Sequence, residues 1–139
     1  MSMNSQARIV IVGGGIMGVA LAYHLAEEGE TNVMLIEKGE LTSGSTWHAA
    51  GQCPSLVSNY NLAKIHDYGN RLYPTLEEKT GQYVSWHASG GIRVARQQAD
   101  IDWFHYMKGI ADNVGFHMEI IDAAKIKALN PFYDIDGVI

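Results

Sequence analysis

The sequence predicts an α/β protein that begins a parallel β-sheet of the doubly wound type. Three features support this prediction: an apolar run at 8–12, a glycine-rich turn directly after it, and a helical pattern followed by a second apolar run at 33–36. A strand, a crossover helix and a second strand in this order form a parallel pair. A complete sheet of this type needs several more strands, so we expect the 139 residues to be an incomplete part of the fold.

Each of these elements has its own signal in the sequence. The run RIVIV at 8–12 is β-branched and does not alternate with polar residues, which is typical of a strand buried on both faces. Apolar residues recur at helical spacing over 16–28, and Gly29 is suited to end that helix. Residues 33–36 form a second short strand. Residues 38–58 are rich in Gly, Ser and Thr without a clear period, which predicts a loop with one helical turn.

The later part of the chain mixes helical and extended signals. Apolar residues spaced three and four apart predict one helix over 61–79 and another over 99–113. Between them, two short runs separated by a Ser-Gly turn predict a β-hairpin with strands at 83–87 and 91–96. Residues 116–121 predict a further strand.

Asp122 is a good N-cap for a last short helix that ends at Leu129, before an Asn-Pro pair. We place a domain boundary in the long loop. Residues 1–58 are then the N-terminal part of a nucleotide-binding domain. Residues 59–139 supply a helix, a hairpin and an α/β segment. They include part of an inserted α+β substrate-domain region and lead into the rest of the nucleotide-binding and substrate domain.

Composition and charge exclude several classes of protein. The chain is 47% hydrophobic and 18% charged, which suits a soluble globular protein. Its net charge of −5 and its lack of a basic run disfavour nucleic acid as a partner. No apolar run suits a membrane span and no import leader precedes the first strand, so we expect a cytoplasmic protein. The lone Cys53 agrees with a reducing compartment, and no HxxxH or CxxC pair predicts a metal site.

The turn between the first strand and the helix reads GGGIMG, with the spacing GxGxxG. Gly13 permits the tight turn, Gly15 lets the backbone approach a pyrophosphate, and Gly18 lets helix and strand pack closely. The free N–H groups and the positive dipole end of the helix then face the phosphates, so Ile16 and Met17 join the expected contacts. In this context the motif is the Rossmann fingerprint of a dinucleotide site.

Glu37 ends the second strand, about 20 residues after the glycine turn, where a carboxylate accepts hydrogen bonds from ribose hydroxyls. Its charge would repel a 2′-phosphate, and the neighbouring Lys38 is not the Arg that usually accommodates one. NADP is therefore disfavoured. We expect both residues to contact the cofactor, with NAD and FAD open at this point.

The next segment, GSTWHAAG at 44–51, resembles the loop that follows the ribose-binding Glu in FAD-dependent amine oxidoreductases of the D-amino-acid oxidase superfamily. The resemblance is closest to the dimethylglycine and sarcosine dehydrogenase group, in which this turn runs along the FAD. It implies that FAD is the cofactor and that it is covalently linked through His48 by its 8α-methyl position. A neutral imidazole is a suitable nucleophile for that bond. Without the family, His48 would be an ordinary loop histidine, one of six in the chain.

The same resemblance assigns further contacts in the loop. Ser45 and Thr46 would lie near the pyrophosphate, where hydroxyl and backbone donors are useful. Ala50 and Gly51 would follow the cofactor. The later segments of the chain also resemble this group, although their motifs are less specific than GSTWHAAG.

The resemblance implies an FAD-dependent dehydrogenase or oxidase of N-methylated amino acids such as dimethylglycine or sarcosine. A hydride would pass from the N-methyl group to the flavin, with an electron-transfer flavoprotein or oxygen as the acceptor. The imine product would yield formaldehyde or be captured by tetrahydrofolate on a separate domain. The catalytic residues are expected beyond residue 139, so the remainder of a split or truncated protein is a further expected partner.

Two alternatives stay open. The first is a non-enzymatic regulatory protein on the same scaffold, of a kind that lacks the flavin-linking histidine; the presence of His48 favours the enzyme. The second is an NAD-binding module.

Overall fold

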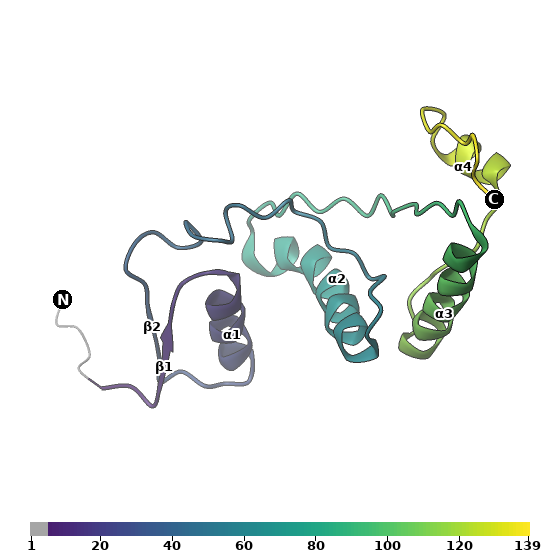
Figure 1. The fold of residues 1–139 in the computed structure, drawn as a ribbon. Coiled ribbons are helices and arrows are strands. Elements are labelled where there is room, and N and C mark those ends of the chain that lie inside the picture. The colour runs from purple at the N-terminus through teal and green to yellow at the C-terminus, as the bar shows by residue number, and fades with distance from the viewer. Residues whose placement is uncertain (1–5) are drawn as a thin grey trace. The chain divides into compact units, whose positions relative to one another are not determined.

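The computed structural model describes residues 6–139, which divide into two units after Gln52 (Figure 1). We call them the N-terminal unit and the C-terminal unit. None of the helices in the described range is long and apolar enough to cross a membrane. The elements in chain order are β1 (Ile9–Val12), α1 (Ile16–Glu27), β2 (Val33–Ile36), α2 (Tyr60–Thr80), α3 (Gln98–Val114) and α4 (Ala123–Leu129).

The N-terminal unit is a βαβ motif, as the sequence predicts. Strands β1 and β2 are parallel, with a register that pairs Ile9 with Val33 and continues to the last residue of each strand. Helix α1 ends where expected, because Gly29 adopts a left-handed φ of 84°. The N–H groups of Gly29 and Glu30 donate to carbonyls of the last turn at 3.0 and 2.8 Å, which satisfies backbone groups that the helix end leaves open.

One expectation about β1 is wrong within this unit, because the strand is not buried on both faces. Ile11 is 6% exposed and lies on the side of α1. Side chains alternate along a strand, so Val10 and Val12 lie on the opposite face, and they are 49% and 83% exposed. Helix α1 covers one face of this short sheet, and within residues 6–52 the other face is open.

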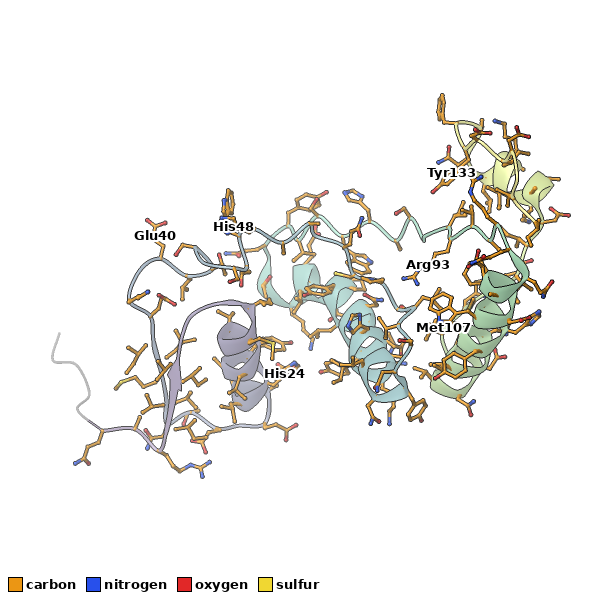
Figure 2. The ribbon with its side chains drawn as sticks, viewed as in Figure 1. His24, Glu40, His48, Arg93, Met107 and Tyr133 are labelled. Atoms are coloured by element: carbon orange, nitrogen blue, oxygen red, sulfur yellow. The ribbon has the colours of Figure 1, made fainter. Side chains whose placement is uncertain are left out.

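The C-terminal unit is built on the contact between α2 and α3. Its core contains Ala63 from α2 and Met107 and Ile110 from α3 (Figure 2). Both helices confirm the predicted ranges within one or two residues, and both end at a glycine in the left-handed conformation. Partly buried apolar residues pack around this core: Leu56, Val57, Val114, Phe116 and Met118.

Helix α4 begins as the sequence predicts. The side chain of Asp122 accepts a hydrogen bond from the Lys125 N–H at 2.8 Å, which caps the helix. After α4, hydrogen bonds join the last residues of the sequence to the segment before α3. The Ile139 N–H donates to the Ala95 carbonyl at 3.0 Å, and the Arg96 guanidinium donates to a backbone carbonyl at 2.9 Å.

The predicted hairpin with strands at 83–87 and 91–96 is wrong, and so is the predicted strand at 116–121. Neither region forms a ladder within the described chain, and the segment from α2 to α3 is extended rather than folded back (Figure 1). A strand needs a partner for its backbone hydrogen bonds, and local propensity does not supply one. Side chains fasten the segment instead: Trp86 stacks on Tyr73, with ring centroids 5.5 Å apart.

Met107 is fully buried, so we expect Met107→Ala to leave a cavity in the C-terminal unit. The free energy of unfolding should fall by about 2–5 kcal/mol. Urea unfolding followed by far-UV circular dichroism measures the change. Leu129→Ala is the matched control, because Leu129 is 58% exposed; its effect should stay below about 0.5 kcal/mol. Equal losses in the two variants would contradict this core assignment.

Candidate cofactor site

The glycine turn joins β1 to α1 in a shape that only glycine accommodates at two of its positions. Gly13 has a φ of 104°, and its N–H donates to the Ile36 carbonyl at 2.8 Å, which ties the turn to the end of β2. A Cβ on Gly18 would lie 2.0 Å from the Gly13 oxygen and 3.3 Å from the Ile11 side chain. The close contact of helix and turn is therefore the physical reason for the last glycine of the motif, as predicted.

A cavity of about 420 Å³ lies at the N-terminus of α1. The first N–H groups of a helix have no partner within the helix. Together with the helix dipole, they favour an anion at the helix N-terminus. The cavity brings together seven of the predicted contact residues from the glycine turn and the loop: Gly13, Gly15, Ile16, Met17, Gly18, Ser45 and Thr46.

Five other predicted contacts do not line this cavity: Glu37, Lys38, His48, Ala50 and Gly51. Their contact with a cofactor stays a prediction. Two lining residues were not predicted, Val12 and Ala49. Val12 is the last residue of β1 and Ala49 follows directly after His48, so proximity to the motifs was the available signal.

Glu37 accepts hydrogen bonds from two backbone N–H groups. Its Oε2 accepts the Gly14 N–H at 2.7 Å, and its Oε1 accepts the Gly39 N–H at 3.0 Å. These two hydrogen bonds, that from Gly14 first, lower the pKa of the Glu37 carboxyl below its ordinary value. Each carboxylate oxygen retains a further lone pair, so the predicted ribose contact is still possible.

Gly14 is the functional residue that sequence reasoning missed. It is buried, and a Cβ there would lie 2.5 Å from the Leu41 side chain and 3.1 Å from the Cβ of Glu37. Its carbonyl accepts the Thr42 N–H at 2.9 Å. The available signal was the middle glycine of GGG, which the GxGxxG spacing leaves unassigned.

The loop after β2 docks on the start of α1. The Ile16 N–H, the first of the helix, donates to the Thr46 hydroxyl at 2.9 Å. Together with the contact between Thr42 and Gly14, this bond holds the loop against the glycine turn. Residues 41–48 form consecutive turns without a helix, so the predicted loop is confirmed and its single helical turn is not.

His48 lies exposed on this loop (Figure 2). Its Nδ1 is 2.9 Å from the Gly44 carbonyl oxygen. A carbonyl oxygen only accepts, so Nδ1 is the donor and carries the hydrogen. In the neutral ring, Nε2 then holds the lone pair and is the nucleophilic atom.

A glycine turn after a parallel strand, a cavity at the following helix N-terminus and an acidic residue at the end of the second strand together define a dinucleotide-binding α/β protein. The model of one family, described as FAD dependent oxidoreductase (DAO), matches residues 8–139. The chain belongs to this family. Membership confirms the predicted Rossmann-type fold and the prediction of FAD as the cofactor.

Three relatives illustrate the relationship. The chain is 44% identical over 134 residues to mitochondrial dimethylglycine dehydrogenase of Rattus norvegicus, over 96% of this chain and 16% of that protein. It is 33% identical over 138 residues to mitochondrial sarcosine dehydrogenase of Homo sapiens, over 96% and 15%. It is also 33% identical over 138 residues to the mitochondrial pyruvate dehydrogenase phosphatase regulatory subunit of Mus musculus, over 99% and 16%.

These matches confirm the predicted resemblance to the dimethylglycine and sarcosine dehydrogenase group. One of the three relatives is named as a regulatory subunit, so the regulatory alternative stays open beside the enzyme. The chain spans about a sixth of the length of each of these three relatives.

We expect Glu37→Gln to destabilise the N-terminal unit in a pH-dependent way. An amide offers one acceptor oxygen where the carboxylate offers two, so one of the N–H groups of Gly14 and Gly39 loses its partner. Because folding lowers the pKa of Glu37 below its ordinary value of 4.5, its contribution is fully present above that pH and is lost as the pH falls through the folded-state pKa. Melting temperatures of both proteins between pH 7 and pH 3 should converge in acid; a constant difference would contradict the assignment.

Gly18→Ala tests the contact between α1 and the glycine turn. The new Cβ would overlap a backbone oxygen that no side-chain rotation relieves, so we expect a loss of about 1–3 kcal/mol in stability and weaker FAD retention. Gly109→Ala is the control with the opposite sign. Gly109 lies inside α3 with open space at its Cβ, and alanine there should stabilise by about 0.5–1 kcal/mol. Thermal denaturation compares the two variants, and a neutral Gly18→Ala would count against the packing.

Proposed function

We propose that this protein holds FAD at the N-terminus of α1 and serves in the oxidation of N-methylated amino acids such as dimethylglycine or sarcosine. The observation that carries the proposal is the cavity that the glycine turn and the loop residues Ser45, Thr46 and Ala49 form together. Membership of the FAD-dependent family and similarity to two dehydrogenases of such substrates support it.

The residues around the cavity fit the pyrophosphate of FAD. Met17 and Gly18 belong to the first turn of α1, so their N–H groups have no carbonyl four residues earlier in the helix. Ser45 and Thr46 also line the cavity and add hydroxyl donors. Glu37 would accept from the ribose through its remaining lone pairs, with Lys38 beside it.

We further propose that FAD is covalently held by His48. The hydrogen bond to the Gly44 carbonyl keeps the hydrogen on Nδ1, so Nε2 is the atom that would bond to the 8α carbon. His48 is exposed and therefore open to that reaction, and Ala50 and Gly51 would continue along the cofactor. When bound, FAD supplies the two-electron acceptor for a hydride of the substrate N-methyl group.

The electron acceptor would be an electron-transfer flavoprotein or oxygen, and the imine product would give formaldehyde or pass to tetrahydrofolate. The catalytic base would come from residues after 139. We propose a cytoplasmic location on the sequence alone, although the names of the three relatives include the word mitochondrial.

A regulatory protein without flavin is the second candidate. It is favoured by the 33% identity to the phosphatase regulatory subunit, which equals the identity to sarcosine dehydrogenase. The 44% identity to dimethylglycine dehydrogenase is higher and favours the enzyme. The presence of flavin on the protein separates the two classes.

We expect purified full-length protein to be yellow and to retain its flavin after acid precipitation. His48→Ala should move all of the flavin to the supernatant, because no other side chain is proposed to bond to the cofactor. His105→Ala, which changes an exposed histidine of α3, is the matched control and should retain the flavin in the pellet. Absorbance at 450 nm of both fractions measures the distribution. Colourless wild-type protein would favour the regulatory class, and flavin that His48→Ala still retains would move the link to another residue.

A further inference from the structure

We propose that Thr46 is a positioning residue whose hydroxyl clamps the turn that bears His48 onto the first amide of α1. The rate at which His48 is joined to FAD should then depend on this hydroxyl. The inference rests on the proposed covalent attachment and adds a residue that acts through His48. Its central observation is the hydrogen bond of 2.9 Å from the Ile16 N–H to Thr46 Oγ1.

The segment around His48 is internally bonded and should move as one body. The Trp47 N–H donates to the Thr42 carbonyl at 3.0 Å, and the His48 N–H donates to the Ser45 carbonyl at 3.2 Å. The His48 ring is bonded to the Gly44 carbonyl in the same turn. The orientation of the imidazole therefore follows the orientation of the whole turn.

Among residues 6–139, two hydrogen bonds connect this body to the glycine turn and the first residue of α1. One joins the Thr42 N–H to the Gly14 carbonyl at 2.9 Å, and the other is the Thr46 clamp. A body held at two separate points cannot rotate freely, whereas a single hydrogen bond leaves it free to pivot. Loss of the Thr46 hydroxyl would therefore allow the imidazole to turn about the contact at Thr42.

The contact at Thr46 is closely fitted. A Cβ on Gly15 would lie 3.2 Å from Thr46 Oγ1, so the hydroxyl occupies the space that a side chain at position 15 would need. A hydroxyl accepts and donates at once, so Thr46 can hold Ile16 and still donate its own hydrogen to a phosphate. The positioning role and the pyrophosphate contact proposed above are thus separable by experiment.

In the attachment reaction, His48 Nε2 forms a bond to the 8α carbon, and one methyl C–H bond breaks. That proton and the imidazole N–H proton end on the flavin ring together with two electrons, and O₂ then takes the electrons and protons as H₂O₂. The position of Nε2 relative to the methyl group controls this step, and a misplacement of about 1 Å costs up to about 100-fold in rate.

The test follows covalent incorporation into the full-length protein, produced flavin-free under riboflavin limitation and then supplied with FAD. Acid-stable flavin is measured against time. We expect Thr46→Val to slow incorporation roughly 10- to 100-fold and Thr46→Ser to stay within about 3-fold of wild type, because serine keeps the hydroxyl. Ser43→Ala is the matched control: its hydroxyl donates to the Glu40 carbonyl, so its loss should leave the rate unchanged.

A second measurement separates positioning from cofactor binding. In a His48→Ala background the affinity for FAD is measured without any covalent step, and adding Thr46→Val should weaken it less than about 5-fold. A loss of affinity as large as the loss of incorporation rate would overturn the proposal and make Thr46 a simple cofactor ligand. An unchanged incorporation rate in Thr46→Val would overturn it while leaving the proposed function intact. A wild-type protein that takes up no FAD would refute the proposed function itself.

Discussion

The structure of the N-terminal unit depends on the backbone of Gly14. Its N–H is held by Glu37 and its carbonyl by Thr42, so one residue connects the end of β2 and the loop after it to the glycine turn. Its missing side chain is equally necessary, because Leu41 and Glu37 occupy the space around its Cα. The end of β2, Glu37 and the loop after it are thus joined through a single buried residue.

The acceptors around the start of α1 also preserve its positive character. The first turn of the helix has no acidic residue, and its first N–H is satisfied by the neutral Thr46 hydroxyl. The carboxylate of Glu37 is instead held by Gly14 and Gly39, which precede and follow Glu37 in sequence. An anion at the cavity therefore meets the helix dipole and backbone donors without a competing carboxylate on the helix end.

Prediction from sequence succeeded where the determining interactions are local. The GxGxxG turn and α1 depend on contacts within a few residues, and the Asp122 cap depends on a residue three positions away. The hairpin at 83–96 failed because a ladder depends on a partner strand that local propensity cannot provide. The role of Gly14 could not be predicted for a related reason. Its partner carboxylate lies 23 residues away, so motif spacing alone could not assign a role to Gly14.

The hydrogen bond from His48 to the Gly44 carbonyl places the choice of tautomer in the main chain. Every amino acid has a backbone carbonyl, so no side-chain replacement at position 44 removes this acceptor. Sequence drift in the loop can therefore alter its surface while the ring keeps the same nucleophilic nitrogen, provided that the turn keeps its shape. The position of the lone pair on the ring is in this way protected from most point mutations around it.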